Sequence, residues 1–257
     1  MKVIGLQFDL AWENKGVNFA AVERLLGAAP PSAGALVVLP EMFATGFSMN
    51  AGAIAEPAGG ETEQFLSRLA QRFGVHLVAG AAKLGRDGQP RNKALVYSPA
   101  GELIAFYAKR RLFSPGGEHQ HYRAGERSVV FEVGDCRVAP LVCYDLRFPE
   151  LFREAAAAHR PELFAVIANF PAKRTSHWLR LLQARAIENQ AYVIGVNRIG
   201  SDPFYDYGGR SVIVDPQGEI VADGGTAEAV ISADLDLFLL RKYRQGLPFL
   251  NDLRLKC

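Results

Sequence analysis

The sequence predicts an α+β protein in which mixed β-sheets are covered by helices. Short apolar runs typical of buried strands alternate with amphipathic helical patterns early and late in the chain. Between these regions, neighbouring strand patterns are separated by turn residues, which indicates hairpins. Pure βαβ winding would lack the hairpins and a β-sandwich would lack the helices, so a mixed arrangement fits best.

The predicted strands are short runs rich in Val, Leu, Ile or Gly. In chain order they lie at 2–8, 35–39, 76–81, 94–97 and 103–107, on both sides of Gly134-Asp135, and at 163–168, 192–196, 211–214 and 219–222. The predicted helices lie at 17–26, 61–73, 150–159 and 176–189. The first two place their Phe, Leu and Val side chains on one face, as expected of helices that cover a sheet.

The chain is long enough for one large domain. It has 257 residues, of which 49% are hydrophobic, and no Pro/Gly/Ser-rich linker or charge run divides it. We therefore expect one domain over 1–257. The stretch at about 237–257 mixes Leu, Phe, Tyr, Arg and Lys, and we expect a helix followed by an extended tail. This tail either lies at a subunit interface or packs on its own subunit.

The net charge and the number of cysteines limit the partners and the cellular location that can be expected. The net charge is +2, from 29 basic and 27 acidic residues, so no nucleic acid or anionic membrane is expected as a partner. No apolar run approaches the roughly 20 residues that span a bilayer, and no signal peptide precedes the first strand. Three cysteines, Cys136, Cys143 and Cys257, are too few for a disulfide framework, which predicts a reducing, cytoplasmic location.

Three predicted strands end in side chains capable of chemistry. Glu41 follows the run at 35–39, Lys109 follows 103–107, and Cys143 follows the strand after Gly134-Asp135. Strand ends are rigid and open onto solvent, so they suit a site. Each residue alone has an ordinary explanation: a solvated carboxylate, a solvated lysine or a small buried thiol. Spacing does not join them.

Together, the three residues could hydrolyse an amide. A thiolate is the nucleophile, and a free cysteine is only a few per cent ionised near pH 7, so Cys143 needs a base. The five histidines are poorly placed by context. Glu41 could serve if burial raises its pKa towards neutrality. Lys109 could hold the oxyanion that develops on the carbonyl.

Four motifs resemble those of the nitrilase superfamily of carbon–nitrogen hydrolases. They are LPEMF at 39–43, YAKR at 107–110, LVCYDLRFPE at 141–150 and ARAIENQ at 184–190. The similarity runs from Met1 to about Tyr243. Within the superfamily, CYDLRFP at 143–149 and NFPAKR at 169–174 most resemble the omega-amidase branch, which hydrolyses the terminal amide of 2-oxoglutaramate and 2-oxosuccinamate.

The resemblance implies a four-layer αββα sandwich, no metal or organic cofactor, and dimers or larger assemblies. It implies that Cys143 is the nucleophile, that Glu41 and Lys109 are its partners, and that Glu118 is a second glutamate that orients them. The Tyr144 N–H would help hold the oxyanion.

The 2-oxo acid amide also needs a pocket with a cation for its carboxylate. Phe43, Tyr144 and Phe170 are the candidate pocket walls, with Trp178 as a further aromatic. Arginine or lysine should meet the substrate carboxylate. The candidates for this contact are Lys173, Arg174, Arg198 and Arg210, of which Lys173 and Arg174 lie in the NFPAKR motif.

Three alternatives stay open. Another superfamily hydrolase would act on N-carbamoyl amino acids, aliphatic amides or nitriles with the same triad. A scaffold protein on this fold would hold an inert, buried Cys143. His119 and His121 beside Glu118 could form a metal site, although no further His or Cys cluster completes it.

Overall fold

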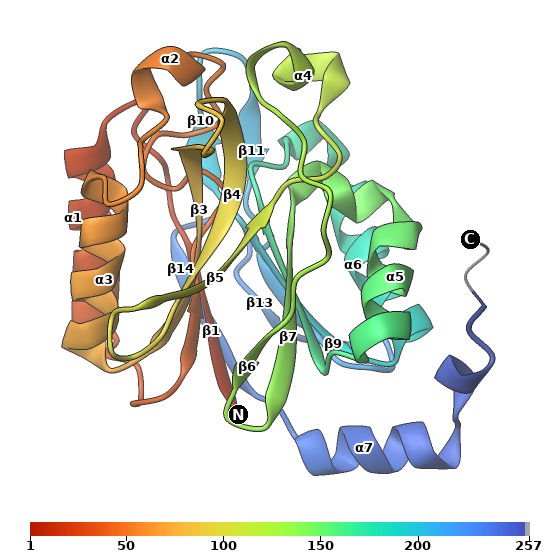
Figure 1. Ribbon diagram of the computed structural model, residues 1–257. Coiled ribbons are helices and arrows are strands. Elements are labelled where there is room, and N and C mark those ends of the chain that lie inside the picture. Colours follow the sequence, from red (N-terminus) through yellow and green to blue (C-terminus); the bar gives the residue numbers. More distant parts are fainter. Residues whose placement is uncertain (255–257) are drawn as a thin grey trace.

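The structure is a computed structural model that describes residues 1–254, and it consists of two six-stranded sheets packed face to face between helices (Figure 1). The first sheet has the strand order β14-β1-β2-β3-β4-β5. Its strands are β1 (Lys2–Gln7), β2 (Leu36–Val38), β3 (His76–Leu84), β4 (Pro90–Tyr97), β5 (Leu103–Ala108) and β14 (Ala229–Asp234).

The second sheet has the order β13-β12-β9-β8-β7-β6. Its strands are β6 (Phe131–Val133), β7 (Cys136–Val142), β8 (Leu163–Ala168), β9 (Tyr192–Asn197), β12 (Val212–Val214) and β13 (Ile220–Asp223). The inner faces of the two sheets meet where β1 contacts β9, β3 contacts β8 and β4 contacts β7. The buried apolar side chains of both sheets form one core between them.

Helices complete the four layers (Figure 1). Helices α1 (Lys15–Ala28) and α3 (Glu61–Phe73) cover the outer face of the first sheet, and α5 (Pro149–His159) and α6 (Thr175–Asn189) cover the second. The predicted αββα sandwich is confirmed. The remaining elements are α2 (Ala51–Ile54), α4 (Glu118–His121), α7 (Leu237–Gly246), the β10 (Ile199–Ser201) and β11 (Asp206–Gly208) hairpin, and short 3-10 turns at 114–116, 143–147, 172–174 and 249–251.

Strand direction brings several strand ends to one edge of the molecule. In the first sheet β2 is parallel to β3, while β4 is antiparallel to both β3 and β5, so β2 and β5 end at the same edge. In the second sheet β7, β8 and β9 are parallel and also end together. The residues that follow these strands are therefore the natural place for a site.

The structure contains short elements that the sequence analysis did not predict, α2, α4 and the β10–β11 hairpin, and it differs further at the C-terminus. The strand β14 was not predicted; it pairs along its whole length with β1, a partner more than 220 residues away. The predicted terminal helix is α7, and the end of the predicted tail, 255–257, lies outside the described residues. Within 1–254, no helix is long and apolar enough to cross a membrane.

Candidate active site

A buried charge cluster lies at the shared strand edge. The Lys109 Nζ is 2.9 Å from Glu41 Oε1 and 2.9 Å from Glu118 Oε2, and all three side chains are fully buried. Lys109 follows β5, Glu41 follows β2, and Glu118 begins the short helix α4. The structure therefore brings together the three charged residues that the sequence singled out, from segments far apart in the chain.

Close backbone packing holds Glu41 in place. Its segment is tied to β3 on both sides, because Gly80 N–H donates to the Pro40 carbonyl and Phe43 N–H donates to the Gly80 carbonyl. A Cβ atom at Gly80 would lie 2.4 Å from the Glu41 Cα. Only glycine permits this approach of the two segments.

The nucleophile candidate sits on a strained turn directly after β7. Cys143 has φ +49°, a left-handed conformation that is uncommon for a residue with a side chain, and it begins the 3-10 turn Cys143–Arg147. The turn is held from α6, where the Arg185 guanidinium donates to the Leu146 carbonyl at 2.7 Å. This contact gives the ARAIENQ segment a structural role, because Arg185 anchors the turn that carries Cys143.

Asp145 fastens the same turn to the lysine segment. Its Oδ2 accepts the Val142 N–H at 3.1 Å and the Tyr107 hydroxyl at 2.9 Å, and its Oδ1 accepts the Arg111 N–H at 2.8 Å. Burial raises the pKa of Asp145 to about 6. One carboxyl thus connects the residue before Cys143 to the residues on both sides of Lys109.

Two asparagines complete the surroundings of Glu41. The Asn92 amide donates to Glu41 Oε1 at 2.7 Å and to Glu118 Oε1 at 2.9 Å. The Asn169 backbone N–H donates to Glu41 Oε2 at 2.8 Å, and the Asn169 side chain donates to the Glu41 carbonyl. The sequence analysis missed these contacts, because neither asparagine is unusual in its own segment.

The electrostatics favour an ionised base and a protonated thiol at rest. Burial works to raise the pKa of Glu41, but the Lys109 charge and the hydrogen bonds from Lys109, Asn92 and Asn169 outweigh it and lower that pKa. The expectation that burial would bring the pKa of Glu41 up to neutrality is therefore wrong. Burial and the Glu41 charge raise the pKa of the Cys143 thiol well above its usual value, although Lys109 opposes this.

Lys109 remains an ammonium. Burial lowers its pKa, but the charges of Glu118 and Glu41 outweigh burial and raise the pKa of Lys109 well above its usual value. The resting cluster thus holds a carboxylate ready to accept a proton and a cation ready to meet negative charge.

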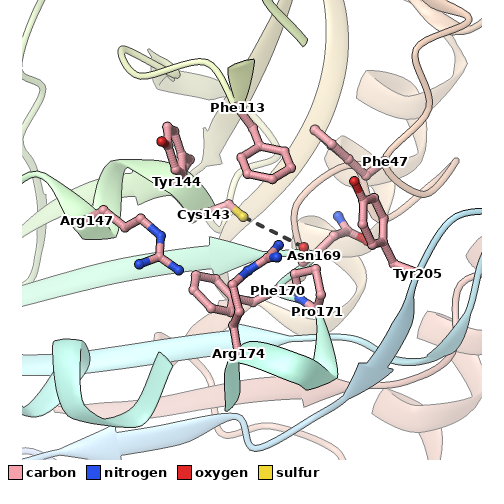
Figure 2. Close-up of a pocket in the computed structure, with 10 residues that line it drawn as sticks. All are labelled: Phe47, Phe113, Cys143, Tyr144, Arg147, Asn169, Phe170, Pro171, Arg174 and Tyr205. Carbon is pink, nitrogen blue, oxygen red and sulfur yellow. Dashed lines mark hydrogen bonds between the residues drawn. The ribbon is translucent and has the colours of Figure 1, made fainter. Parts of the chain in front are cut away.

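A pocket opens onto Cys143, as Figure 2 shows. The Cys143 Sγ lies 3.8 Å from the Asn169 carbonyl oxygen. The lining residues are Phe47, Phe113, Cys143, Tyr144, Arg147, Asn169, Phe170, Pro171, Arg174 and Tyr205. Glu41, Lys109 and Glu118 are fully buried and are not among the lining residues, but the Lys109 Nζ is 5.0 Å from the centre of the ring of Phe47, which is one of them.

Three of the predicted substrate-binding residues, Tyr144, Phe170 and Arg174, line the pocket. Phe43 does not: it is buried against Phe19 and Phe65 in the core under α1 and α3. Placing Phe43 in the pocket was wrong, because its side chain points away from the sheet interface.

The other cation candidates are placed elsewhere. Lys173 is exposed and does not line the pocket, since the 3-10 turn at 172–174 directs it to solvent. Arg198 is buried and paired with Asp9, and Arg210 is paired with Asp223. Trp178 packs behind Phe170 and donates its indole N–H to the Arg210 carbonyl.

Arg147 is a pocket residue that the sequence analysis did not select. It lies four residues after Cys143 at the end of the nucleophile turn, so the turn geometry carries it into the pocket. Within the described chain, neither Arg147 nor Arg174 forms an ion pair; the Arg147 guanidinium lies 5.6 Å from the centre of the Phe170 ring, and the Arg174 guanidinium 5.5 Å from the centre of the Phe113 ring (Figure 2). Their positive charge is available to a ligand.

His119 and His121 are exposed on α4 while Glu118 is buried beside Lys109. Across residues 1–254, no group of three or more His, Cys, Asp or Glu side chains is arranged to hold a metal ion. The two histidines therefore have no geometric support as ligands in the described chain.

Comparisons with known proteins identify the family of the chain. The family model described as carbon-nitrogen hydrolase matches residues 3–245. The chain is 40% identical to the omega-amidase YafV of Escherichia coli (strain K12), over 98% of this chain and 96% of that protein. It is 34% identical to the 2-oxoglutaramate amidase of Bacillus subtilis (strain 168), over 97% and 96%.

A solved structure is also similar over its whole length. XC1258 from Xanthomonas campestris, described as a CN-hydrolase superfamily protein with an arsenic adduct in the active site, superposes with a TM-score of 0.94. The two chains are 32% identical, and the match covers 100% of this chain and 98% of the other. The resemblance inferred from the four sequence motifs is confirmed, and the chain belongs to the carbon–nitrogen hydrolase family.

Proposed function

We propose that this chain is an omega-amidase, which hydrolyses the terminal amide of 2-oxo dicarboxylate monoamides such as 2-oxoglutaramate and 2-oxosuccinamate. The observation that carries the proposal is a thiol beside a buried glutamate–lysine pair, at the end of a pocket with two arginines that form no ion pair with residues 1–254. The names of the two relatives at 40% and 34% identity support the same reaction. As a family member, the chain is a hydrolase of carbon–nitrogen bonds in linear amides.

The first half of the reaction forms a thioester. Glu41 accepts the proton of Cys143 while the sulfur attacks the amide carbon. The negative charge that develops on the carbonyl oxygen is met by the Lys109 ammonium and by the N–H of Tyr144, which is in the first turn of a helix and has no acceptor there. Glu41 then passes its proton to the leaving nitrogen, and ammonia departs.

The second half hydrolyses the thioester. Glu41 takes a proton from water, the resulting hydroxide attacks the acyl carbon, and the 2-oxo acid leaves as the sulfur recovers its proton. Glu118 exchanges no proton in this scheme. Its Oε2 fixes the Lys109 ammonium through the 2.9 Å contact. Its Oε1 accepts a hydrogen bond from the Asn92 amide, which keeps the Glu118 carboxylate in place.

The substrate carboxylate is proposed to bind Arg174, with Arg147 beside it. A planar guanidinium matches a carboxylate with two parallel hydrogen bonds. Both arginines line the pocket and neither pairs with a carboxylate within 1–254, although Arg147 lies 3.3 Å from the His177 Nδ1, whereas Arg198 and Arg210 already neutralise aspartates. An amide without a distant carboxylate would leave this charge unused, which separates omega-amides from the nitriles and simple amides used elsewhere in the superfamily.

We also propose a cytoplasmic location and a homo-oligomeric state for this chain. Within residues 1–254, Cys136 and Cys143 are both free thiols, which fits a cytoplasmic location. Helix α7 is fastened to its own subunit by Arg241 to Asp135, yet it exposes 75% of Phe238 and 57% of Leu239. We propose that a second copy of the chain covers these two side chains.

A substrate panel tests the main proposal. We expect ammonia release to be fastest with 2-oxoglutaramate, slower with glutamine and butyramide, and absent with N-carbamoyl amino acids and nitriles. Cys143→Ala should lower turnover by about 10³-fold or more, because the nucleophile is lost. Preference for a carbamoyl amino acid or a nitrile, or full activity of Cys143→Ala, would contradict the proposal.

Replacing the base should change the ionisation of the nucleophile. The Glu41 charge raises the pKa of Cys143, so Glu41→Gln should move the thiolate titration to lower pH by roughly 1–3 units while abolishing turnover. The ultraviolet absorbance of the thiolate measures this, with Cys143→Ala as the blank. A midpoint that stays in place or rises would show that Glu41 does not face the sulfur as proposed.

Removing the arginine charge should weaken binding of the substrate more than the chemical step. For Arg174→Gln we expect KM for 2-oxoglutaramate to rise by about 10- to 100-fold, since a charged hydrogen bond is lost, with a smaller change in kcat. Activity on butyramide should be unaffected. Lys173→Gln, the exposed neighbour outside the pocket, is the matched control and should behave like the wild type.

The proposed interface at α7 is tested by the molecular mass of the protein in solution. We expect the wild-type chain to scatter light as a dimer or larger assembly, and Phe238→Ser with Leu239→Ser to shift it toward the monomer without unfolding it. A monomeric wild type at working concentrations would overturn the proposal.

A further inference from the structure

The two carboxylates of the site share a donor that carries no charge. The Asn92 side-chain nitrogen donates one hydrogen to Glu41 Oε1 and the other to Glu118 Oε1, at 2.7 and 2.9 Å. Its backbone carbonyl accepts the Lys109 N–H at 2.9 Å. One residue of β4 therefore contacts all three charged residues. If the amide were turned around, its oxygen would face two carboxylates, so the contacts themselves fix its orientation.

The two hydrogen bonds that Asn92 donates come with an unfavourable feature, a buried acceptor that has no partner within the described chain. The side chain is fully buried, and its Oδ1 has no hydrogen-bond partner within the described chain. A buried amide that leaves its acceptor unpaired is unfavourable. An apolar side chain at position 92 would avoid that cost. We therefore attribute the presence of asparagine to the two hydrogen bonds that it donates to Glu41 and Glu118.

We propose that Asn92 is a positioning residue that sets the basicity of Glu41 by giving it one hydrogen bond without adding charge, a role that rests on the proposed function of Glu41 as the base. Glu41 Oε1 has two donors, Asn92 and Lys109. A second cation in place of Asn92 would hold Glu41 too firmly as a carboxylate. Without any donor, two carboxylates would face each other with a single ammonium between them, and Glu41 would bind a proton too readily.

The other groups around Glu41 do not duplicate this contact. Lys109 faces it from the residue after β5 and Cys143 from the nucleophile turn, while Glu118 in α4 lies on the other side of Lys109. Tyr122 and Tyr207 feel the Glu41 charge, and burial raises the pKa of both hydroxyls, so they stay neutral. The Asn169 donors reach the opposite oxygen, Oε2.

The test measures the proton on Glu41 directly. Carbon-13 NMR of glutamate-labelled protein, with Glu41 assigned by its loss in Glu41→Gln, gives the carboxyl titration without any substrate. A hydrogen bond to the charged form lowers a pKa, so its removal must raise it. We expect the Glu41 midpoint to rise by about one pH unit in Asn92→Leu and by less in Asn92→Ser, which retains one donor. The acidic limb of kcat/KM for 2-oxoglutaramate should move by the same amount, with KM within about two-fold.

A matched control separates this role from general stability. Asn18 is also fully buried, and its amide donates to the Ala11 and Ala44 carbonyls away from the site. Asn18→Leu should lower the thermal midpoint without moving the Glu41 titration. If Asn92→Leu does not fold, Asn92→Ser decides. An unchanged Glu41 midpoint in the folded Asn92 variants overturns the inference. Absence of amide turnover in the wild type overturns the proposed function, while the NMR titration still decides the role of Asn92.

Discussion

The site depends on one buried ion cluster, the Lys109 ammonium held between Glu41 and Glu118. An ion removed from water loses several kcal/mol of solvation, and removing one partner of such a cluster costs about 3–5 kcal/mol. The cluster can exist only where all of its members arrive together. The fold supplies that place because β2 and β5 run in the same direction within one sheet. The sheet order is therefore a condition for the chemistry and not only a scaffold.

The charge of the cluster explains how the thiol can react. Two carboxylates and one ammonium leave an excess negative charge, which opposes ionisation of Cys143 at rest. Proton transfer from sulfur to Glu41 moves that charge without changing its total, so the buried site never gains or loses a net charge during attack. The charge then passes to the carbonyl oxygen of the substrate, nearer to Lys109. The cost of burying ions is paid once, at folding, and not again in each turnover.

Elements with a strong local pattern, and the residues that directly follow them, could be predicted from the sequence. Helix 61–73 and strand 163–168 have strong local patterns and appear with the same bounds in the structure. Glu41, Lys109 and Cys143 could be singled out because each follows a strand pattern, and their assembly into one site was suggested by the motifs. Strand β14 was missed because its partner β1 is at the other end of the chain, and no local pattern records such pairing.

The residues that sequence reasoning misplaced share a physical cause. Whether a side chain near a strand end faces the core or the pocket depends on local backbone geometry: Phe43, two residues after Glu41, turns under α1 and α3, while Arg147 is carried into the pocket by a 3-10 turn. The pKa of Glu41 likewise could not be judged from an apolar neighbourhood in sequence. Its direction is decided first by the charge and hydrogen bond of Lys109, and then by donors from Asn92 and Asn169, which reach it from β4 and from the end of β8.

Asn169 also shows that the site belongs to both sheets. Its N–H and side chain hold Glu41 of the first sheet, while its carbonyl contacts the sulfur of Cys143, and all of this occurs at the end of β8 in the second sheet. Base and nucleophile are thus carried by opposite sheets and aligned by one residue that touches both. The distance over which the proton must move is then set by how tightly the two inner faces pack. A dense apolar core between the sheets is consequently part of the catalytic arrangement, since it fixes a separation that hydrogen bonds alone would leave loose.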